Sequence, residues 1–245
     1  MMLFAIDRHK KARLILIGGL FALLILARLV VLFDDGHLVT ATRLKPVRQI
    51  NTDVPAVALT FDLAYGEDTL PLLLKTLREQ SIPATFFLSG SWASAHPALV
   101  DVIQADGHTI GTLGYSGGRL CDLGAAALQA ELSSAIKALA AQTGHTPQFF
   151  RPPDGACNDD LVQVATEQGL LTILWTVEAA PGRVRDSEAL VHRVVARVRP
   201  GAIIRLRADD GAYLTYAALP ELITALKAHG LCCLALPDLF AAAID

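Results

Sequence analysis

From residue 56 onward the chain alternates between short apolar runs and longer stretches in which apolar residues recur at i, i+3 and i+4. Short runs of this kind are typical of strands that are buried on both faces of a parallel sheet. They predict strands over residues 56–61, 84–88, 108–110, 148–150, 171–175, 202–206 and 231–235. The stretches between them predict helices over residues 69–80, 97–105, 125–142, 159–168, 187–198 and 216–229.

This alternation indicates an α/β domain with a parallel sheet and with helices outside it. Four glycines fall just past predicted helix ends, where a C-terminal cap is expected: Gly107, Gly144, Gly169 and Gly230. The pattern alone fits either a barrel of strands and helices or an open, doubly wound sheet.

One apolar stretch near the N-terminus, residues 14–33, lacks a polar face and is interrupted only by Arg28. As a helix it would be about 30 Å long, the thickness of a bilayer core. Basic residues precede it and acidic residues follow it: Arg8, Lys10, Lys11 and Arg13, then Asp34 and Asp35. This asymmetry predicts a transmembrane anchor with a cytoplasmic N-terminus. The alternatives are a cleaved signal peptide and a buried helix of the domain.

The expected organisation is therefore a basic cytoplasmic segment (residues 1–13), an anchor (14–33), a linker (34–53) and an extracytoplasmic domain (54–245). The net charge is −3 and the only basic run flanks the anchor, so nucleic acid is not expected as a partner. The four cysteines show no C-x-x-C spacing typical of metal sites. Outside the cytoplasm Cys121 and Cys157 can form a disulfide. Cys232 and Cys233 are expected as buried apolar side chains of a strand.

Asp62 stands where the first predicted strand ends, and in (β/α) barrels this end of the strands carries the chemistry. The alternative is that Asp62 caps the next helix or fixes a loop. Polar residues also follow the other predicted strands and would share one rim of a barrel: Ser89, Tyr115, Arg151, Asp154, Glu178, Arg207, Asp209 and Asp210. Carboxylates and guanidiniums gathered on one rim indicate a polar site.

Four segments, in this order, resemble the motifs of the polysaccharide deacetylase family, whose domain is named after the rhizobial chitooligosaccharide deacetylase. They are Thr60-Phe61-Asp62, Ala84-Thr85-Phe86-Phe87, Gly107-His108-Thr109-Ile110-Gly111 and Arg151-Pro152-Pro153-Asp154-Gly155. The resemblance covers nearly all of residues 55–240 and looks closest to the sporulation-associated branch. It implies a distorted seven-stranded (β/α) barrel, which agrees with the number of predicted strands.

The chain departs from active members of the family at four positions. In those members a divalent metal is bound by a second Asp of the first motif and by two His, and a late His protonates the leaving amine. Here these positions carry Leu63, Leu113, Gly117 and Arg207. An arginine stays protonated and cannot act as an acid and then as a base. We therefore expect no metal ligand set and no cofactor, and we expect His96 and His108 to be packing or capping residues.

Asp62 and Arg151 are the catalytic residues that the resemblance leaves in place, as a base and as the arginine that orients it. Substrate contacts are expected from the other rim residues, with aromatic faces against sugar rings. These residues are Tyr115, Pro152, Arg207, Asp210 and Trp92. For each aromatic residue of the rim, Trp175 included, a place in the core is the alternative.

The resemblance implies a membrane-anchored protein of cell-wall glycan metabolism, in which peptidoglycan or another N-acetylated glycan is the partner. The missing metal ligands and acid favour a catalytically silent relative that binds glycan, or an envelope protein, in the former catalytic cleft. One alternative is a metal-independent hydrolase of amide C–N bonds in N-acetylated glycan, with Asp62 as the base. Another is a structural scaffold in an envelope or spore-assembly complex.

Overall fold

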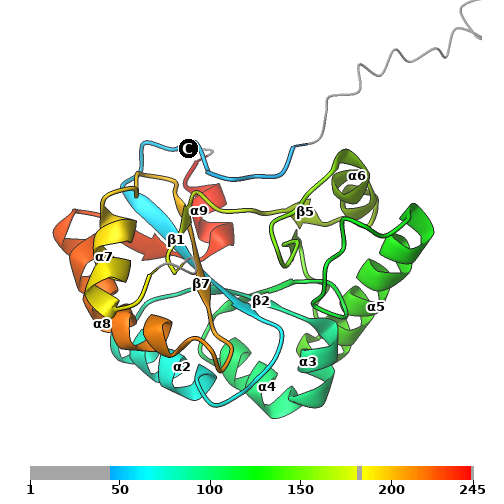
Figure 1. Cartoon of the computed structure of the whole chain (residues 1–245), viewed down its shortest axis with the longest axis horizontal. Helices are drawn as coiled ribbons and strands as arrows, with labels where there is room; N and C mark the ends of the chain where they lie inside the picture. Colours follow the sequence, from blue (N-terminus) through cyan, green and yellow to red (C-terminus); the bar gives the residue numbers. More distant parts are fainter. Residues whose placement is uncertain (1–44, 181–183, 244–245) are drawn as a thin grey trace, which may run out of the picture. The chain divides into compact units, whose positions relative to one another are not determined.

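The computed structural model describes residues 45–180 and 184–243. They form one curled, parallel sheet, and most of the helices lie around its outside (Figure 1). The strands are β1 (Ala56–Leu63), β2 (Thr85–Leu88), β3 (Thr109–Thr112), β4 (Phe149–Phe150), β5 (Leu171–Thr172), β6 (Val177–Glu178), β7 (Ile203–Arg207) and β8 (Cys232–Leu234). The helices are α2 (Leu70–Glu79), α3 (Gly90–Ala95), α4 (Pro97–Ala105), α5 (Ala125–Thr143), α6 (Asp159–Glu167), α7 (Ser187–Val195), α8 (Tyr213–Ala228) and α9 (Leu236–Ala241).

Strand β1 pairs with three other strands of the sheet, whose strand order is β5-β4-β3-β2-β1-β7-β6. One edge of β1 pairs with β7, and the other edge pairs first with β8 and then with β2, always in parallel. Because parallel strands run in one direction, their carboxyl ends meet at one rim of the curled sheet. This arrangement agrees with the (β/α) barrel that the resemblance implied.

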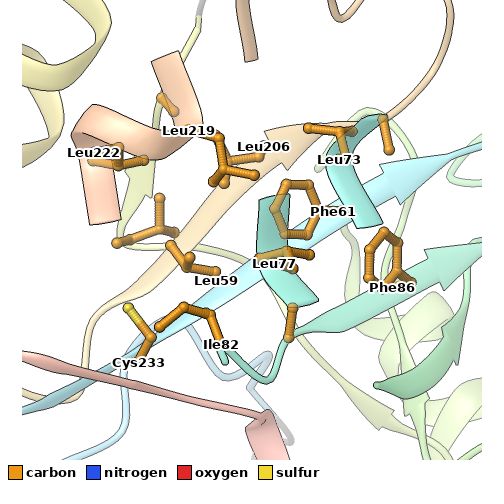
Figure 2. Packing of buried hydrophobic residues seen from close by; sticks show 14 of the residues in the cluster. Leu59, Phe61, Leu73, Leu77, Ile82, Phe86, Leu206, Leu219, Leu222 and Cys233 are labelled. Carbon is orange, nitrogen blue, oxygen red and sulfur yellow. The ribbon is translucent and has the colours of Figure 1, made fainter. Parts of the chain in front are cut away.

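Two hydrophobic clusters lie on opposite faces of β1, because successive side chains of a strand point to opposite faces. Its odd-numbered residues from Val57 to Leu63 belong to the outer cluster, which packs the sheet against α2 and α8 (Figure 2). Its even-numbered Ala56 and Ala58 belong to the inner cluster, together with Ile50, Phe87, Leu113, Phe149, Ile173, Ile203, Leu236 and Leu239. By the same alternation, Asp62 faces the interior of the sheet at its carboxyl end.

The predicted elements are present, with changes at some of their ends. The predicted strand over 171–175 ends at Thr172, and a further short strand, β6, follows after four residues. The short helices α3 and α9 were not predicted, because six residues are too few to show a helical period. Helix α8 begins three residues earlier than the predicted start at residue 216.

The end of the predicted linker lies against the sheet. Val47 pairs with Ile173 and Gln49 pairs with Ala202, so residues 47–49 connect the segment after β5 with the segment before β7. Gly201 permits this approach: its φ is +75°, and a Cβ atom there would lie 1.7 Å from the Ile50 carbonyl oxygen. The predicted anchor and basic segment lie outside the described residues. Within the described ranges no helix combines the length and the apolar character needed to cross a membrane.

The cysteines are free thiols. Cys121 and Cys157 are partly buried against the same hydrophobic cluster and are not joined by a disulfide. Cys233 is buried as predicted, and burial raises the pKa of its thiol to about 12. Cys232 is exposed, which corrects the prediction for that residue, because the two neighbours point to opposite sides of β8.

Candidate functional site

Asp62 and Arg151 form a buried ion pair at the carboxyl end of the sheet. The Arg151 Nη1 donates to Asp62 Oδ1 at 2.8 Å, and the Arg151 and Asp62 side chains are 0% and 8% exposed, respectively. Arg151 follows β4, and its remaining nitrogens donate to the carbonyls of Ile173 and Leu174 at 3.4 and 3.3 Å. Its guanidinium also lies 4.0 Å from the centre of the Phe87 ring. The structure thus brings together the two residues that the sequence predicted as catalytic.

Burial lowers the pKa of Arg151, and the Asp62 carboxylate acts in the opposite direction. A guanidinium removed from water needs a partner for its charge and hydrogen-bond acceptors for its nitrogens. Asp62 supplies the charge, and the two carbonyls supply the other acceptors. The pair is therefore a structural unit of the barrel as well as a candidate site.

A second arginine, Arg205, binds the other oxygen of Asp62. Its Nε donates to Asp62 Oδ2 at 2.6 Å, and its Nη1 donates to Glu178 Oε1 at 2.7 Å. Its Nη2 donates to the Pro153 carbonyl at 3.1 Å, and the guanidinium lies 4.4 Å from the centre of the Trp175 ring. Both carboxylate oxygens of Asp62 are thus hydrogen-bonded to guanidinium groups.

No role for Arg205 was predicted from the sequence. A usable signal was present, because a charged residue inside the predicted buried strand 202–206 must find a partner in the core. The partners come from neighbouring strands: Arg205 is in register with Thr60 of β1 and with Glu178 of β6. The sequence alone could not show which carboxylate pairs with Arg205, because the pairing depends on the register of β7 with its neighbouring strands.

The positions that correspond to metal ligands in the family do not fit a divalent cation. Leu63 is fully buried in the outer cluster, on the opposite face of β1 from Asp62. Leu113 is 2% exposed and packs in the inner cluster. Gly117 has a φ of +68°, and a Cβ atom there would lie 2.9 Å from the Ala64 Cβ. Within residues 45–180 and 184–243, no three His, Cys, Asp or Glu side chains form a group that could hold a metal ion.

Arg207 lies on the outer part of the rim, two residues beyond Arg205 on β7. Its guanidinium binds both Asp209 oxygens at 2.8 Å and donates to the Tyr65 hydroxyl at 2.6 Å. The hydrogen bond to Asp209 raises the pKa of Arg207, and partial burial opposes this effect. The Arg207 side chain stays 44% exposed, so it is accessible to a ligand.

Arg207 also lines a cavity of about 620 Å³ at the starts of α7 and α8. The cavity wall includes Arg185 and Ser187 at the start of α7, and Tyr213 at the start of α8. The Tyr213 side chain is strongly exposed, and Tyr65 beside Arg207 is exposed as well. Aromatic faces next to fixed hydrogen-bonding groups are suited to binding a polar ring.

Two further predicted substrate-binding residues hold the loop between β1 and α2. Trp92 is 3% exposed, and its indole N–H donates to the Gly66 carbonyl at 2.7 Å. Its ring stacks on His96 rather than facing solvent. Asp210 accepts a hydrogen bond from the Asp68 backbone N–H at 2.8 Å. In this structure both residues hold the loop in place. Trp92 is buried, as in the alternative that places it in the core.

The last two predicted contacts lie apart from each other. Tyr115 is 38% exposed on the loop after β3, and its ring lies beside Gly90 at the start of α3. Pro152 is buried, and its carbonyl accepts a hydrogen bond from Gly155 in the loop after β4. Their roles as substrate contacts stay predictions.

Comparison with known proteins identifies the family. The polysaccharide deacetylase family model matches residues 49–173. An uncharacterized Bacillus subtilis protein, YlxY, is 29% identical over 76% of this chain and 57% of its own length. The peptidoglycan-N-acetylglucosamine deacetylase of Bacillus cereus is 30% identical over 75% of this chain and 68% of its own length. The chain thus spans little more than half of the first of these relatives.

Solved structures agree with this assignment. BA3943 of Bacillus anthracis, a CE4 family pseudoenzyme, superposes with a TM-score of 0.76 at 26% identity, over 81% of this chain and 70% of that one. A mutant of BA3943 with restored enzymatic activity gives the same TM-score at 27% identity, over 81% and 72% of the two chains. Sequence motifs, family model and fold therefore agree, and the chain belongs to the polysaccharide deacetylase family.

Proposed function

We propose that this protein is a glycan-binding member of its family that does not carry out metal-dependent deacetylation. The observation that carries the proposal is the set of side chains at the three metal-ligand positions: Leu63 and Leu113 are buried among apolar residues, and Gly117 has no side chain. No rotamer change can turn these residues into ligands. The similarity to the pseudoenzyme BA3943 supports the same conclusion.

The ligand we propose is an N-acetylated cell-wall glycan such as peptidoglycan, on which the Bacillus cereus relative acts according to its name. The cavity at the starts of α7 and α8 offers Tyr213 as a platform for a sugar ring and Arg207 as a hydrogen-bond donor. An exposed aromatic face contributes about 1 kcal/mol to such a contact, or roughly a fivefold change in affinity.

We also propose that residues 14–33 anchor the protein in the cell membrane, with the N-terminus in the cytoplasm and the barrel outside. The apolar stretch and the basic residues before it support this placement. Membranes from cells that produce the full chain should retain it during an alkaline carbonate wash. Release by that wash would contradict the anchor.

A specific observation favours a second function, a metal-independent hydrolase. Asp62 and Arg151 are still paired at 2.8 Å, as expected for a base and the residue that orients it. This alternative requires Asp62 to accept a proton, and Asp62→Asn removes that ability.

The deciding experiment measures acetate release and glycan binding in parallel. The full chain is incubated with N-acetylglucosamine oligomers and with peptidoglycan fragments, with and without divalent metal. We expect no acetate, saturable glycan binding, and binding about fivefold weaker in Tyr213→Ala. Leu171→Ala, which removes an exposed side chain of β5, is the control for unspecific loss.

Acetate release that Asp62→Asn abolishes would establish the hydrolase instead. Absence of both acetate and glycan binding would contradict both proposals. The remaining hypothesis would then be a structural scaffold in an envelope or spore-assembly complex.

A further inference from the structure

We propose that the Arg205 guanidinium fills a pocket beside Asp62 as a bound ligand would. There it blocks substrate from reaching the Asp62 carboxylate. The proposal deepens the proposed function, on which it rests. It assigns glycan binding to the outer rim beside Arg207 and explains why Asp62 does not act as a base.

The pocket surrounds the Arg205 guanidinium with three kinds of complementary group. Each nitrogen has its own acceptor: Asp62 Oδ2 at 2.6 Å, Glu178 Oε1 at 2.7 Å and the Pro153 carbonyl at 3.1 Å. Trp175 covers one face of the planar cation at 4.4 Å. Two carboxylates, a carbonyl and an aromatic face are the groups that recognise a guanidinium in a binding site.

The sheet register places Arg205 in this pocket. Strand β7 lies between β1 and β6, so Arg205 stands opposite Thr60 on one side and opposite Glu178 on the other. Asp62 is two residues beyond Thr60 on the same face of β1. The side chain therefore reaches Asp62 from within the sheet, and only 15% of its surface is exposed.

Charge balance favours an occupied pocket. With Arg205 in place, two arginines face two carboxylates, since Arg151 and Arg205 meet Asp62 and Glu178. Without Arg205, a largely buried site would hold one excess negative charge beside an aromatic ring. Such a site is expected to bind a small cation in place of the lost side chain.

The consequence for catalysis is geometric. A base must come within hydrogen-bond reach of the group that gives up the proton, and Arg205 occupies the space beside Asp62 that this group would need. Both Asp62 oxygens already accept short hydrogen bonds from guanidinium donors, Oδ1 from Arg151 and Oδ2 from Arg205. Arg207 shows the contrast on the same strand, because it pairs with Asp209 and stays 44% exposed.

The test is chemical rescue of Arg205→Ala by guanidinium chloride, at concentrations up to about 20 mM and at constant ionic strength. Intrinsic fluorescence of the two tryptophans reports the melting temperature, and because Trp92 lies away from Arg205, an emission change specific to Arg205→Ala reports the surroundings of Trp175. We expect the full-length variant to melt at least about 5 °C lower than the wild type. We expect guanidinium to raise this temperature saturably by a few degrees, and sodium chloride to have no such effect.

The matched control is Arg193→Ala. Arg193 donates to the backbone carbonyl of Glu178, so its loss vacates no buried carboxylate. Neither this variant nor the wild type should respond to guanidinium. If Arg205→Ala does not fold in buffer alone, it is prepared in guanidinium, and its unfolding when guanidinium is removed is measured instead. Failure to fold in guanidinium as well, while Arg193→Ala folds, would overturn the proposal.

Two further results would overturn the proposal: a variant with wild-type melting temperature and emission, or a destabilised variant that responds to guanidinium no better than Arg193→Ala does. The glycan pull-down is scored separately. If the wild type does not bind glycan but guanidinium still stabilises Arg205→Ala, the proposed function is rejected and the guanidinium pocket is retained. Retained glycan binding without rescue would reject the pocket alone.

Discussion

At the scale of single residues, Asp62 is the carboxylate that both Arg151 and Arg205 bind. Asp62→Ala would leave Arg151, which is fully buried, without a counterion. Removing one partner of a buried ion pair costs about 3–5 kcal/mol, so we expect the melting temperature to fall by roughly 10 °C. Asp62→Asn should have a smaller effect, because its amide oxygen still accepts one hydrogen bond.

The control for Asp62 is another carboxylate paired with an arginine but exposed. The Asp122 side chain is 69% exposed and lies 2.9 Å from Arg119. Asp122→Ala should change the melting temperature by less than about 2 °C, because surface pairs contribute little. Equal effects of Asp62→Ala and Asp122→Ala would show that the buried pair is not a stabilising unit.

His108 gives the fold a dependence on pH. It is buried, its Nδ1 accepts a hydrogen bond from the Ala84 N–H, and its Nε2 has no hydrogen-bond partner among the described residues. Burial lowers the pKa of His108 from its usual value of 6.5; Asp106 opposes this shift and Arg78 adds to it. Below pH 6.5 the unfolded chain therefore binds more protons than the folded protein, and stability falls as the pH falls.

We expect urea unfolding to show an effect of His108 below about 0.2 kcal/mol between pH 8 and 7, and a loss of up to about 1.4 kcal/mol per pH unit below its unfolded pKa. His108→Gln should remove the contribution of His108 to the loss of stability in acid, because an amide does not titrate. The amide oxygen can still accept the hydrogen bond from the Ala84 N–H. His145→Gln, at an exposed histidine, serves as the control. A His108→Gln variant that loses stability in acid as steeply as the wild type would contradict the assignment.

At the scale of elements, the loop between β1 and α2 is held from three sides. Trp92 binds the Gly66 carbonyl, Asp210 binds the Asp68 N–H, and Arg207 binds the Tyr65 hydroxyl. Gly66 itself has a φ of +78°, and a Cβ atom there would lie 2.3 Å from the Asp210 carboxyl carbon. The conformation of the loop between β1 and α2 therefore depends on Gly66 and on the side chains that contact it.

Gly66→Ala should consequently strain the loop and displace Asp210. We expect a loss of about 1–3 kcal/mol, or roughly 3–10 °C in melting temperature, together with weaker glycan binding. Gly118→Ala is a suitable control, because Gly118 lies on the rim and an added Cβ atom there would stay 3.5 Å from the Ser116 hydroxyl, its nearest neighbour among the described residues. Unchanged stability of Gly66→Ala would show that the loop relaxes freely.

The elements also show what the sequence could predict. Long periodic helices and buried strands were visible because their apolar spacing is set by the geometry of the element itself. The pairing of Asp62 with Arg151 followed from the resemblance, and the structure has it. Arg205 was missed because its partners come from two neighbouring strands. The sequence also did not show that the Trp92 N–H binds the Gly66 carbonyl inside the fold. Both depend on register and packing, which no local pattern encodes.

At the scale of the whole molecule, the proposed function predicts that this chain responds to divalent metal differently from an active deacetylase. A metal that binds only the folded state at a hundred times its Kd would add about 2.7 kcal/mol of stability, or roughly 5–10 °C. Leu63, Leu113 and Gly117 offer no ligand atoms, so zinc or cobalt should shift the melting temperature by less than about 1 °C. The measurement uses the full chain without an expression tag, with the Bacillus cereus relative measured alongside it.

The same measurement applies to a variant with the ligands restored, which combines Leu63→Asp, Leu113→His and Gly117→His. The first change would place a carboxylate in the apolar outer cluster where Leu63 packs, and the last would require a side chain at a φ near +68°. We therefore expect this variant to lose stability and to gain little from zinc while Arg205 still binds Asp62. A large zinc-dependent shift in the wild type would mean that a ligand set exists outside the described residues, and the proposal of a silent site would then fail.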